Sequence, residues 1–307
     1  MENIIEVKNV KKSYQDIVAV NEITFQVKKG EFFGFLGPNG AGKSTTINMM
    51  CTMLKPTSGE ICINGFDAVK DETEVRKNIG IIFQENTLDQ NLTAFENMMM
   101  HCKYYKIPKK DRQEKIEEVL NMVALWDKKD KIVNTFSGGM KRRLEIARGM
   151  LHSPKVLFLD EPTIGLDPQT KVHIWEYMFK LKERDNTTIF LTTHHMDEVE
   201  ACDRIAIMDH GKIIALDTPK KLKEDLGGDI IELVSDDSKK LIAEIKNKYN
   251  INAMEKDGVI RFTVEKGSAF MTMFLKNVES VVKSINIRQP TLNDVFLHLT
   301  GRQMRDE

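Results

Sequence analysis

Gly37-Pro38-Asn39-Gly40-Ala41-Gly42-Lys43-Ser44-Thr45 is the stretch that decides the fold of this 307-residue chain. Its spacing, Gly-x4-Gly-Lys-Ser, is the pattern of a phosphate-binding loop. Glycines let backbone N–H groups approach phosphate oxygens, Lys43 would reach the β and γ phosphates, and Ser44 would offer its hydroxyl to Mg²⁺. An apolar run at 31–36 precedes the loop, so the strand–loop–helix order is present. A glycine-rich turn with a chance Lys-Ser is the plainer alternative, and this context disfavours it.

A second motif, Asp160-Glu161-Pro162, directly follows the apolar run at 156–159. Such a run is typical of a buried parallel strand, and open α/β sheets bind ligands at the carboxyl ends of their strands. We therefore expect Asp160 to hold Mg²⁺ and Glu161 to accept a proton from the attacking water as general base. A solvated acidic pair at the start of a loop is the alternative interpretation.

A third motif, Phe136-Ser137-Gly138-Gly139-Met140, opens a basic helix. With the three motifs in this order, residues 3–220 resemble the ATP-binding subunit of ABC transporters. The family signature is usually Leu-Ser-Gly-Gly-Gln, and its three central positions match Ser137, Gly138 and Gly139. Met140 replaces the usual glutamine. Together with the basic residues that follow, this departure is similar to the drug-exporter branch that contains the daunorubicin-resistance ATPases.

The resemblance implies an α/β phosphate-loop NTPase fold of the ABC ATPase type. The expected parts are a mostly parallel core sheet, an N-terminal antiparallel β part, and a helical subdomain inserted at about 90–150. We expect the ATPase domain to occupy 1–226, because Gly227-Gly228 ends a short basic helix. Residues 227–307 read as strand, helix, strand, strand, helix, strand and a last helix. This order predicts a small α+β accessory domain with no catalytic constellation.

The resemblance also implies roles for single residues. His194 would be the switch histidine at the γ-phosphate, so the predicted catalytic residues are Lys43, Glu161 and His194. Tyr14 would stack on adenine, although a surface tyrosine on a strand is the alternative. The predicted nucleotide-binding residues are Tyr14, Gly37, Pro38, Asn39, Gly40, Ala41, Gly42, Lys43, Ser44, Thr45, Gln84, Ser137, Gly138 and Gly139. The predicted Mg²⁺ ligands are Ser44, Gln84 and Asp160.

Other uses of these residue types are less favoured by the sequence. The pair His194-His195 has no cysteine or further histidine at zinc-ligand spacing, and His195 is interpreted as a bystander. The net charge of −1 argues against nucleic acid as a partner. Four scattered cysteines fit reduced thiols, and no apolar run approaches the roughly 20 residues that span a bilayer. We expect a cytoplasmic protein, held at the cytoplasmic face of the cell membrane only through its partner.

The resemblance also implies the function and a site that one chain leaves incomplete. One chain supplies the phosphate loop and the acidic pair, while Ser137 would face the ATP of a second copy or a related ATPase subunit. The prediction is an ATP-binding and hydrolysing subunit of an ABC transporter, an exporter that energises a separate ABC-2-type transmembrane permease. Residues 85–105, with Met98-Met99-Met100, would form part of the docking surface, unless the methionines only fill the core. The alternatives are a soluble ABC-type ATPase acting on ribosomes or nucleic acid, and a non-enzymatic nucleotide sensor.

Overall fold

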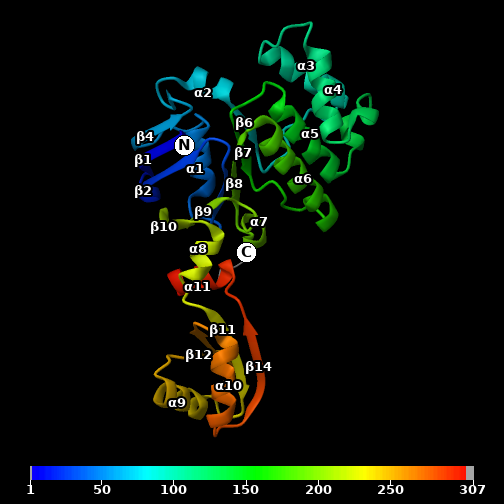
Figure 1. Cartoon of the computed structure of the whole chain (residues 1–307). Helices are drawn as coiled ribbons and strands as arrows, with labels where there is room; N and C mark the ends of the chain where they lie inside the picture. Colours follow the sequence, from blue (N-terminus) through cyan, green and yellow to red (C-terminus); the bar gives the residue numbers. More distant parts are fainter. Residues whose placement is uncertain (1, 302–307) are drawn as a thin grey trace. The chain divides into compact units, whose positions relative to one another are not determined.

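The computed structural model describes residues 2–301. The chain forms two compact units, of which the first ends at Leu216 and the second begins at Asp217 (Figure 1). The predicted boundary after residue 226 therefore falls inside the second unit. The reason is that helix α8 (Pro219–Glu224) packs against α11 (Leu292–Thr300) near the end of the chain, instead of ending the ATPase domain.

A six-stranded sheet with the order β10-β9-β3-β8-β7-β6 forms the centre of the first unit. Its strands are β3 (Phe32–Leu36), β6 (Ile79–Ile82), β7 (Val156–Asp160), β8 (Thr188–Thr193), β9 (Arg204–Asp209) and β10 (Lys212–Asp217). The pairs β3–β8, β3–β9, β7–β8 and β6–β7 are parallel. Every residue of β3, β7 and β8 is buried, which explains the apolar character of β3 and of the first four residues of β7. The predicted parallel core sheet is confirmed.

A second, antiparallel sheet has the order β2-β1-β4-β5. Its strands are β1 (Asn3–Tyr14), β2 (Ile17–Lys28), β4 (Ser58–Ile63) and β5 (Phe66–Asp67). The short N-terminal β runs seen in the sequence thus belong to two continuous strands of 12 residues each. The β1–β2 ladder contains several irregular register steps.

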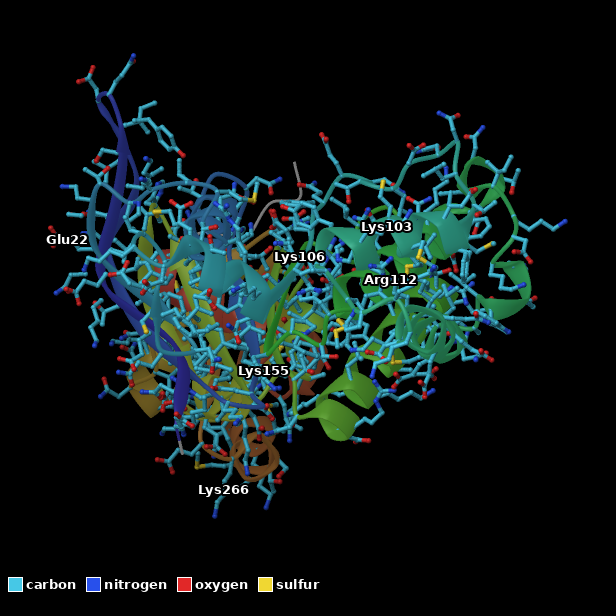
Figure 2. All side chains as sticks on the ribbon, turned by 90° about the horizontal axis from the view of Figure 1, so that it is seen from above. Glu22, Lys103, Lys106, Arg112, Lys155 and Lys266 are labelled. Carbon is cyan, nitrogen blue, oxygen red and sulfur yellow. The ribbon has the colours of Figure 1, made fainter. Side chains whose placement is uncertain are left out.

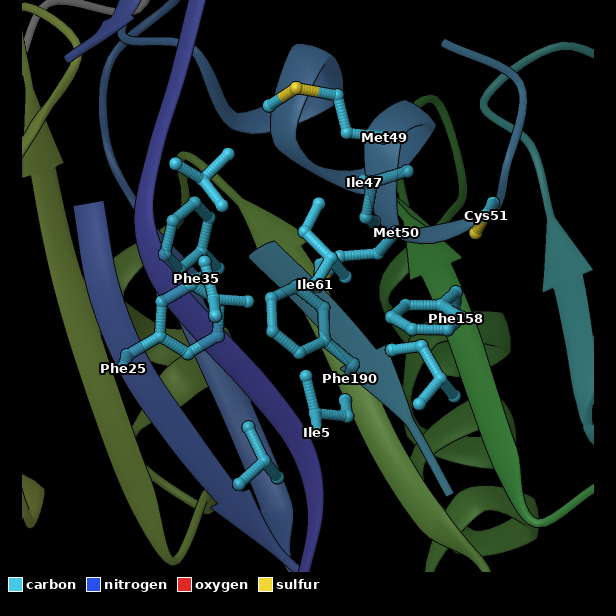
Figure 3. Packing of buried hydrophobic residues seen from close by; sticks show 14 of the residues in the cluster. Ile5, Phe25, Phe35, Ile47, Met49, Met50, Cys51, Ile61, Phe158 and Phe190 are labelled. Carbon is cyan, nitrogen blue, oxygen red and sulfur yellow. The ribbon is translucent and has the colours of Figure 1, made fainter. Parts of the chain in front are cut away.

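The main core lies between the two sheets and helix α1 (Lys43–Met50). Phe25, Phe35 and Phe190 point toward one another in Figure 3, with ring centroids 5.5–6.1 Å apart. On the other face of the parallel sheet, Phe32 stacks on Trp175 of α6 (Pro168–Asp185) at 5.3 Å. Phe32 and Phe35 therefore pack on opposite faces of the sheet. Packing on both faces holds β3, the strand that leads into the phosphate loop, in place.

The inserted helical part contains α3 (Ala94–Tyr104), α4 (Arg112–Met122) and α5 (Gly138–Met150), with 3₁₀ turns at Trp126–Lys128 and Val133–Thr135. Helix α2 (Glu72–Asn78) precedes it. Thr93 and Glu96 form the predicted capping box at the start of α3. The apolar stripe Ile116, Val119, Leu120 and Val123 is buried, as its helical spacing predicts. Lys103, Lys106 and Arg112 belong to the α3–α4 region (Figure 2).

The second unit has the strand–helix–strand–strand–helix–strand order that the sequence predicts. Its elements are β11 (Asp229–Ser235), α9 (Ser238–Tyr249), β12 (Met254–Lys256), β13 (Val259–Val264), α10 (Gly267–Asn277) and β14 (Val282–Arg288). The sheet order is β12-β13-β11-β14, and all its pairs are antiparallel. A separate core, which includes Ile231, Leu241, Phe262 and Phe274, holds it together.

Candidate functional site

The phosphate loop leaves β3 at the carboxyl edge of the parallel sheet and leads into α1. Gly42 caps this helix with φ 105°, a left-handed conformation that favours glycine. A Cβ atom on Gly37 would collide with the carbonyl oxygen of Met208, so the loop also needs glycine where it passes β9. Local sequence therefore directs the N–H groups at the start of α1 outward, which makes an anion-binding site.

Lys43 is buried and lies beneath this loop. Its Nζ donates to the carbonyls of Gly37 at 2.7 Å and Pro38 at 3.1 Å, and lies 3.7 Å from Glu161 Oε1. Burial lowers the pKa of the Lys43 ammonium, while the nearby Glu161 and Asp160 carboxylates act in the opposite direction. The phosphate loop and the acidic motif therefore both lie against the ammonium group of Lys43.

Asp160 ends β7 beside the first turn of α1. Ser44 Oγ lies 3.4 Å from Asp160 Oδ1, which also accepts a hydrogen bond from the Thr192 hydroxyl. The three oxygen-bearing side chains lie on three different elements, and Mg²⁺ prefers oxygen ligands. Thr192, at the end of β8, has no motif around it that could have predicted its contact with Asp160.

Glu161 and His194, two of the predicted catalytic residues, lie side by side in the structure. Glu161 Oε1 lies 3.0 Å from His194 Nδ1, and both side chains are largely buried. The Glu161 N–H donates to the Thr192 carbonyl at 3.1 Å, which ties the acidic motif to the neighbouring strand. Glu161 has φ 47°, a left-handed conformation that is costly for a residue other than glycine. Such a conformation persists only where neighbouring groups hold it.

An open pocket of about 670 Å³ unites most of the predicted residues. It is lined by Ala19, Asn39, Gly40, Gly42, Lys43, Ser44, Thr45, Gln84, Glu161, Ile164 and His194. This volume lies in the usual range for small-molecule sites, roughly 300–1000 Å³. Gln84, which is distant from the phosphate loop in the sequence, shares this pocket with Glu161 and His194.

Eight predicted residues do not line this pocket: Tyr14, Gly37, Pro38, Ala41, Ser137, Gly138, Gly139 and Asp160. Tyr14 is 46% exposed, and Lys12 Nζ lies 5.1 Å from its ring centroid. Ser137 and Gly138 are exposed, and the Ser137 hydroxyl caps α5 by accepting from Met140 N–H at 3.3 Å. Gly139 packs beside Thr170 of α6. The signature turn, Ser137–Gly139, therefore contributes nothing to the pocket of its own chain.

Two buried residues near the site were missed by sequence reasoning. Glu198, on α7 (Met196–Val199), accepts hydrogen bonds from the hydroxyls of Thr163 and Thr193 and so supports both the acidic turn and His194. Arg142, on α5, donates to the backbone of the acidic turn. Charged residues on helices are usually solvated, so the sequence did not predict the burial of either residue, although Arg142 belongs to the basic run that follows the signature motif.

Comparison with known proteins decides the family. An ABC transporter family model matches residues 20–164, and a model of the C-terminal domain of DrrA1-3-like ATP-binding proteins matches residues 218–300. The linearmycin resistance ATP-binding protein LnrL of Bacillus subtilis (strain 168) is 39% identical, over 99% of this chain and 100% of that protein. The chain belongs to the family of ABC transporter ATP-binding proteins. Its likeness to the drug-exporter branch is confirmed.

Two further ABC proteins extend the comparison. The Nod factor export ATP-binding protein I of Rhizobium sp. (strain N33) is 38% identical, over 98% of this chain and 98% of that protein. The dimeric ATP-binding cassette MJ0796, solved in a post-hydrolysis state with ADP and Pi, is 31% identical, with a TM-score of 0.64. That alignment covers 70% of this chain and 98% of the cassette. The predicted phosphate-loop NTPase fold is thereby confirmed.

This ABC ATP-binding chain is therefore an ATP-binding and ATP-hydrolysing subunit of an ABC transporter. Subunits of this kind work with separate membrane permeases, and the cassette MJ0796 is dimeric. The alternative of an ABC-type ATPase that acts on ribosomes or nucleic acid is not favoured. Among residues 2–301, no helix combines the length and the apolar character needed to cross a bilayer.

Proposed function

We propose that this subunit hydrolyses ATP with Mg²⁺ in a composite site between two ATPase copies, and that it drives an ABC-2-type exporter. One observation carries the proposal. Lys43, Gln84, Glu161 and His194 share one pocket, whereas the exposed signature turn lies outside it. Ser137 and the N-terminus of α5 are suited to an anion, and they remain available to the ATP of another copy.

In the proposed reaction, the backbone N–H groups of the phosphate loop and Lys43 bind the β and γ phosphates. Glu161 orients the attacking water and accepts its proton, because its carboxylate lies in the pocket within reach of the phosphate loop. His194, 3.0 Å from Glu161, holds that carboxylate and contacts the γ-phosphate. Tyr14 lies on the strand preceding Ala19, which lines the pocket, and is proposed to stack on adenine.

The residues around Ser44 fit a magnesium ion. Ser44 and Asp160 bring two oxygens within 3.4 Å of each other, and Gln84 lines the same pocket. We assign these three residues as its protein ligands. When bound, Mg²⁺ neutralises charge on the phosphates during transfer. The Thr192 hydroxyl, which donates to Asp160, keeps this carboxylate turned toward Ser44.

Export and the permease type are inferred from the relatives. LnrL is named for linearmycin resistance, the Rhizobium protein is named for Nod factor export, and the second unit matches a DrrA1-3-like domain. Met140 in the signature motif supports the same branch. The chain would then act at the cytoplasmic face of the cell membrane, held there by the permease, with a second copy or a related ATPase subunit beside it.

A single variant tests the composite site. Glu161→Gln removes the proton acceptor but leaves the phosphate loop intact, so we expect ATP binding to remain and turnover to fall roughly a hundredfold or more. With Mg-ATP, this variant is expected to accumulate as a dimer in size-exclusion chromatography with light scattering. Adding Ser137→Arg should abolish the dimer while ATP still binds.

Two outcomes would contradict the proposal. If Glu161→Gln stays monomeric while saturated with Mg-ATP, the sandwich arrangement is wrong. If it turns over ATP at the normal rate, Glu161 is not the general base. Lys43→Ala provides the control for both measurements, because it should lose ATP binding and with it any ATP-dependent dimer.

A further inference from the structure

The side chain of Arg142 is a buried hub on α5, the helix that begins at the signature turn. Its Nε donates to the carbonyl of Pro162 at 2.8 Å. Its Nη2 lies 3.3 Å from the carbonyl of Asp160 and 3.4 Å from that of Glu161. Its Nη1 donates to the carbonyl of Phe83, the residue before Gln84. One guanidinium thus binds the backbone of the acidic turn and of the Gln84 segment, residues 83–88.

A carboxylate on the same helix completes the arrangement. Glu145 Oε2 lies 3.2 Å from Arg142 Nη1, and its Oε1 accepts from the N–H of Thr87 at 2.8 Å. Arg148, one turn further along α5, donates to the carbonyl of Thr87 at 2.9 Å. The Gln84 segment is therefore tied to α5 at both of its ends.

The energetic cost of this hub suggests that it does more than fill space. Removing a guanidinium and a carboxylate from water is expensive, and well-packed apolar residues often replace a buried ion pair without loss of stability. Arg142 and Glu145 are only 7% and 3% exposed. Their charged groups bind backbone carbonyls and one backbone N–H group, and the positions of these backbone groups set the geometry of the pocket. The buried charges therefore orient the backbone around the ATP site.

The acidic turn needs such support. Glu161 has a left-handed backbone, and its N–H is held by the Thr192 carbonyl. The three consecutive carbonyls of residues 160–162 all point to Arg142. A lysine would supply one point charge in place of the rigid planar fork, so it would not span these acceptors together.

We propose that Arg142 is a positioning residue for ATP hydrolysis, which fixes the Glu161 backbone and couples it to the Gln84 segment and the signature helix. Movement of the Gln84 segment or of α5 then reorients the general base. The inference rests on the proposed role of Glu161. It assigns to Arg142 no contact with ATP.

Arg142→Lys tests the proposal, with Arg143→Lys as the matched control on the same helix. Arg143 donates to the carbonyl of Val123, away from the acidic turn. Because small misplacements of reacting groups are costly, we expect Arg142→Lys to lower kcat roughly tenfold to a hundredfold. The Kd for a fluorescent ATP analogue and the KM should stay within about threefold, since Lys43 and the phosphate loop are untouched. Arg143→Lys should change none of these values.

A double-variant cycle separates positioning from mere structural damage. If Arg142 acts through Glu161, Arg142→Lys in the Glu161→Gln background should lower single-turnover hydrolysis no further. An additive loss would overturn the proposal, as would normal kcat in Arg142→Lys. If Arg142→Lys does not fold, Arg142→Gln, which keeps a neutral amide donor, enters the same cycle with the same expected results. Normal turnover in Glu161→Gln alone would instead refute the proposed function.

Discussion

At the scale of single residues, two histidines outside the ATP site are kept uncharged by their surroundings. The pKa of His101 is lowered to about 3 and that of His152 to about 4, mainly because burial disfavours the charged ring. His152 Nε2 contacts the carbonyl of Ile79 at 2.8 Å, and Tyr105 stacks on the His152 ring at 3.8 Å. Among residues 2–301, His101 Nε2 and His152 Nδ1 have no hydrogen-bond partner.

These depressed values predict a loss of stability in acid. Below an ordinary histidine pKa of about 6.5, both histidines bind a proton in the unfolded chain but stay neutral in the folded chain. The free energy of unfolding therefore falls as pH decreases. Each histidine should contribute a loss of about 1.4 kcal/mol per pH unit below that value. Urea unfolding between about pH 7 and pH 5 would measure it.

The variant His101→Phe provides the comparison for that titration. It keeps a buried ring, removes the titrating group and breaks no hydrogen bond of Nε2, so its stability should depend less steeply on pH. Identical pH dependence in the wild type and in His101→Phe would show that His101 titrates normally in the folded protein.

At the scale of elements, helix α3 presents two different faces. Met98 is fully buried, so for this residue core filling was the correct interpretation, whereas Met100 is 50% and Tyr104 78% exposed. These two side chains follow the Gln84 segment in the chain, which the Arg142 hub connects to the acidic turn. An exposed apolar pair at this place suits contact with the permease, and docking through α3 stays a prediction.

A negative charge introduced on the exposed face of α3 would test the prediction that this helix docks on the permease. In Met100→Glu or Tyr104→Glu, docking would bury an unpaired carboxylate, and a cost of at least about 1.4 kcal/mol weakens binding tenfold. We expect permease-dependent transport to fall roughly tenfold or more, while basal ATPase activity of the isolated subunit stays unchanged. Met254→Glu, at a 76% exposed methionine of the second unit, is the control. Unimpaired transport in both α3 variants would rule this face out.

At the scale of the whole molecule, the ATP site and the accessory fold have separate cores. All pocket residues belong to the first unit, while Phe274, with no exposed surface, lies in the core of the second. A defect in the second core should therefore leave nucleotide binding intact, although the unit matches a domain of DrrA1-3-like proteins.

Phe274→Ala tests this independence. Deleting a buried phenylalanine ring typically costs about 3–5 kcal/mol, so the second unit should unfold at a lower temperature. Calorimetry should show the transition of the first unit unmoved, and the Kd for ATP should be unchanged. Loss of ATP binding without any change in the first transition would show that the units are functionally linked.

The sequence alone determined those features that depend on local chemistry. The loop of residues 37–45, the strand ending in Asp160 and the capping box at Thr93 each follow from spacing and residue type over a few positions. The alternation of strands and helices in the second unit was readable for the same reason. The boundary was misplaced because α8 packs against α11, a contact between segments far apart in the chain.

Only the tertiary structure decided which distant groups meet. The family resemblance had already placed Gln84 and His194 at the ATP site, but only the structure turned Thr192 toward Asp160 and aimed Arg142 at three consecutive carbonyls. Backbone acceptors carry no side-chain identity, so no pattern of letters could reveal that the acidic turn depends on an arginine of the signature helix. That dependence arises from packing, which places a buried charge where the backbone of Glu161 must be held.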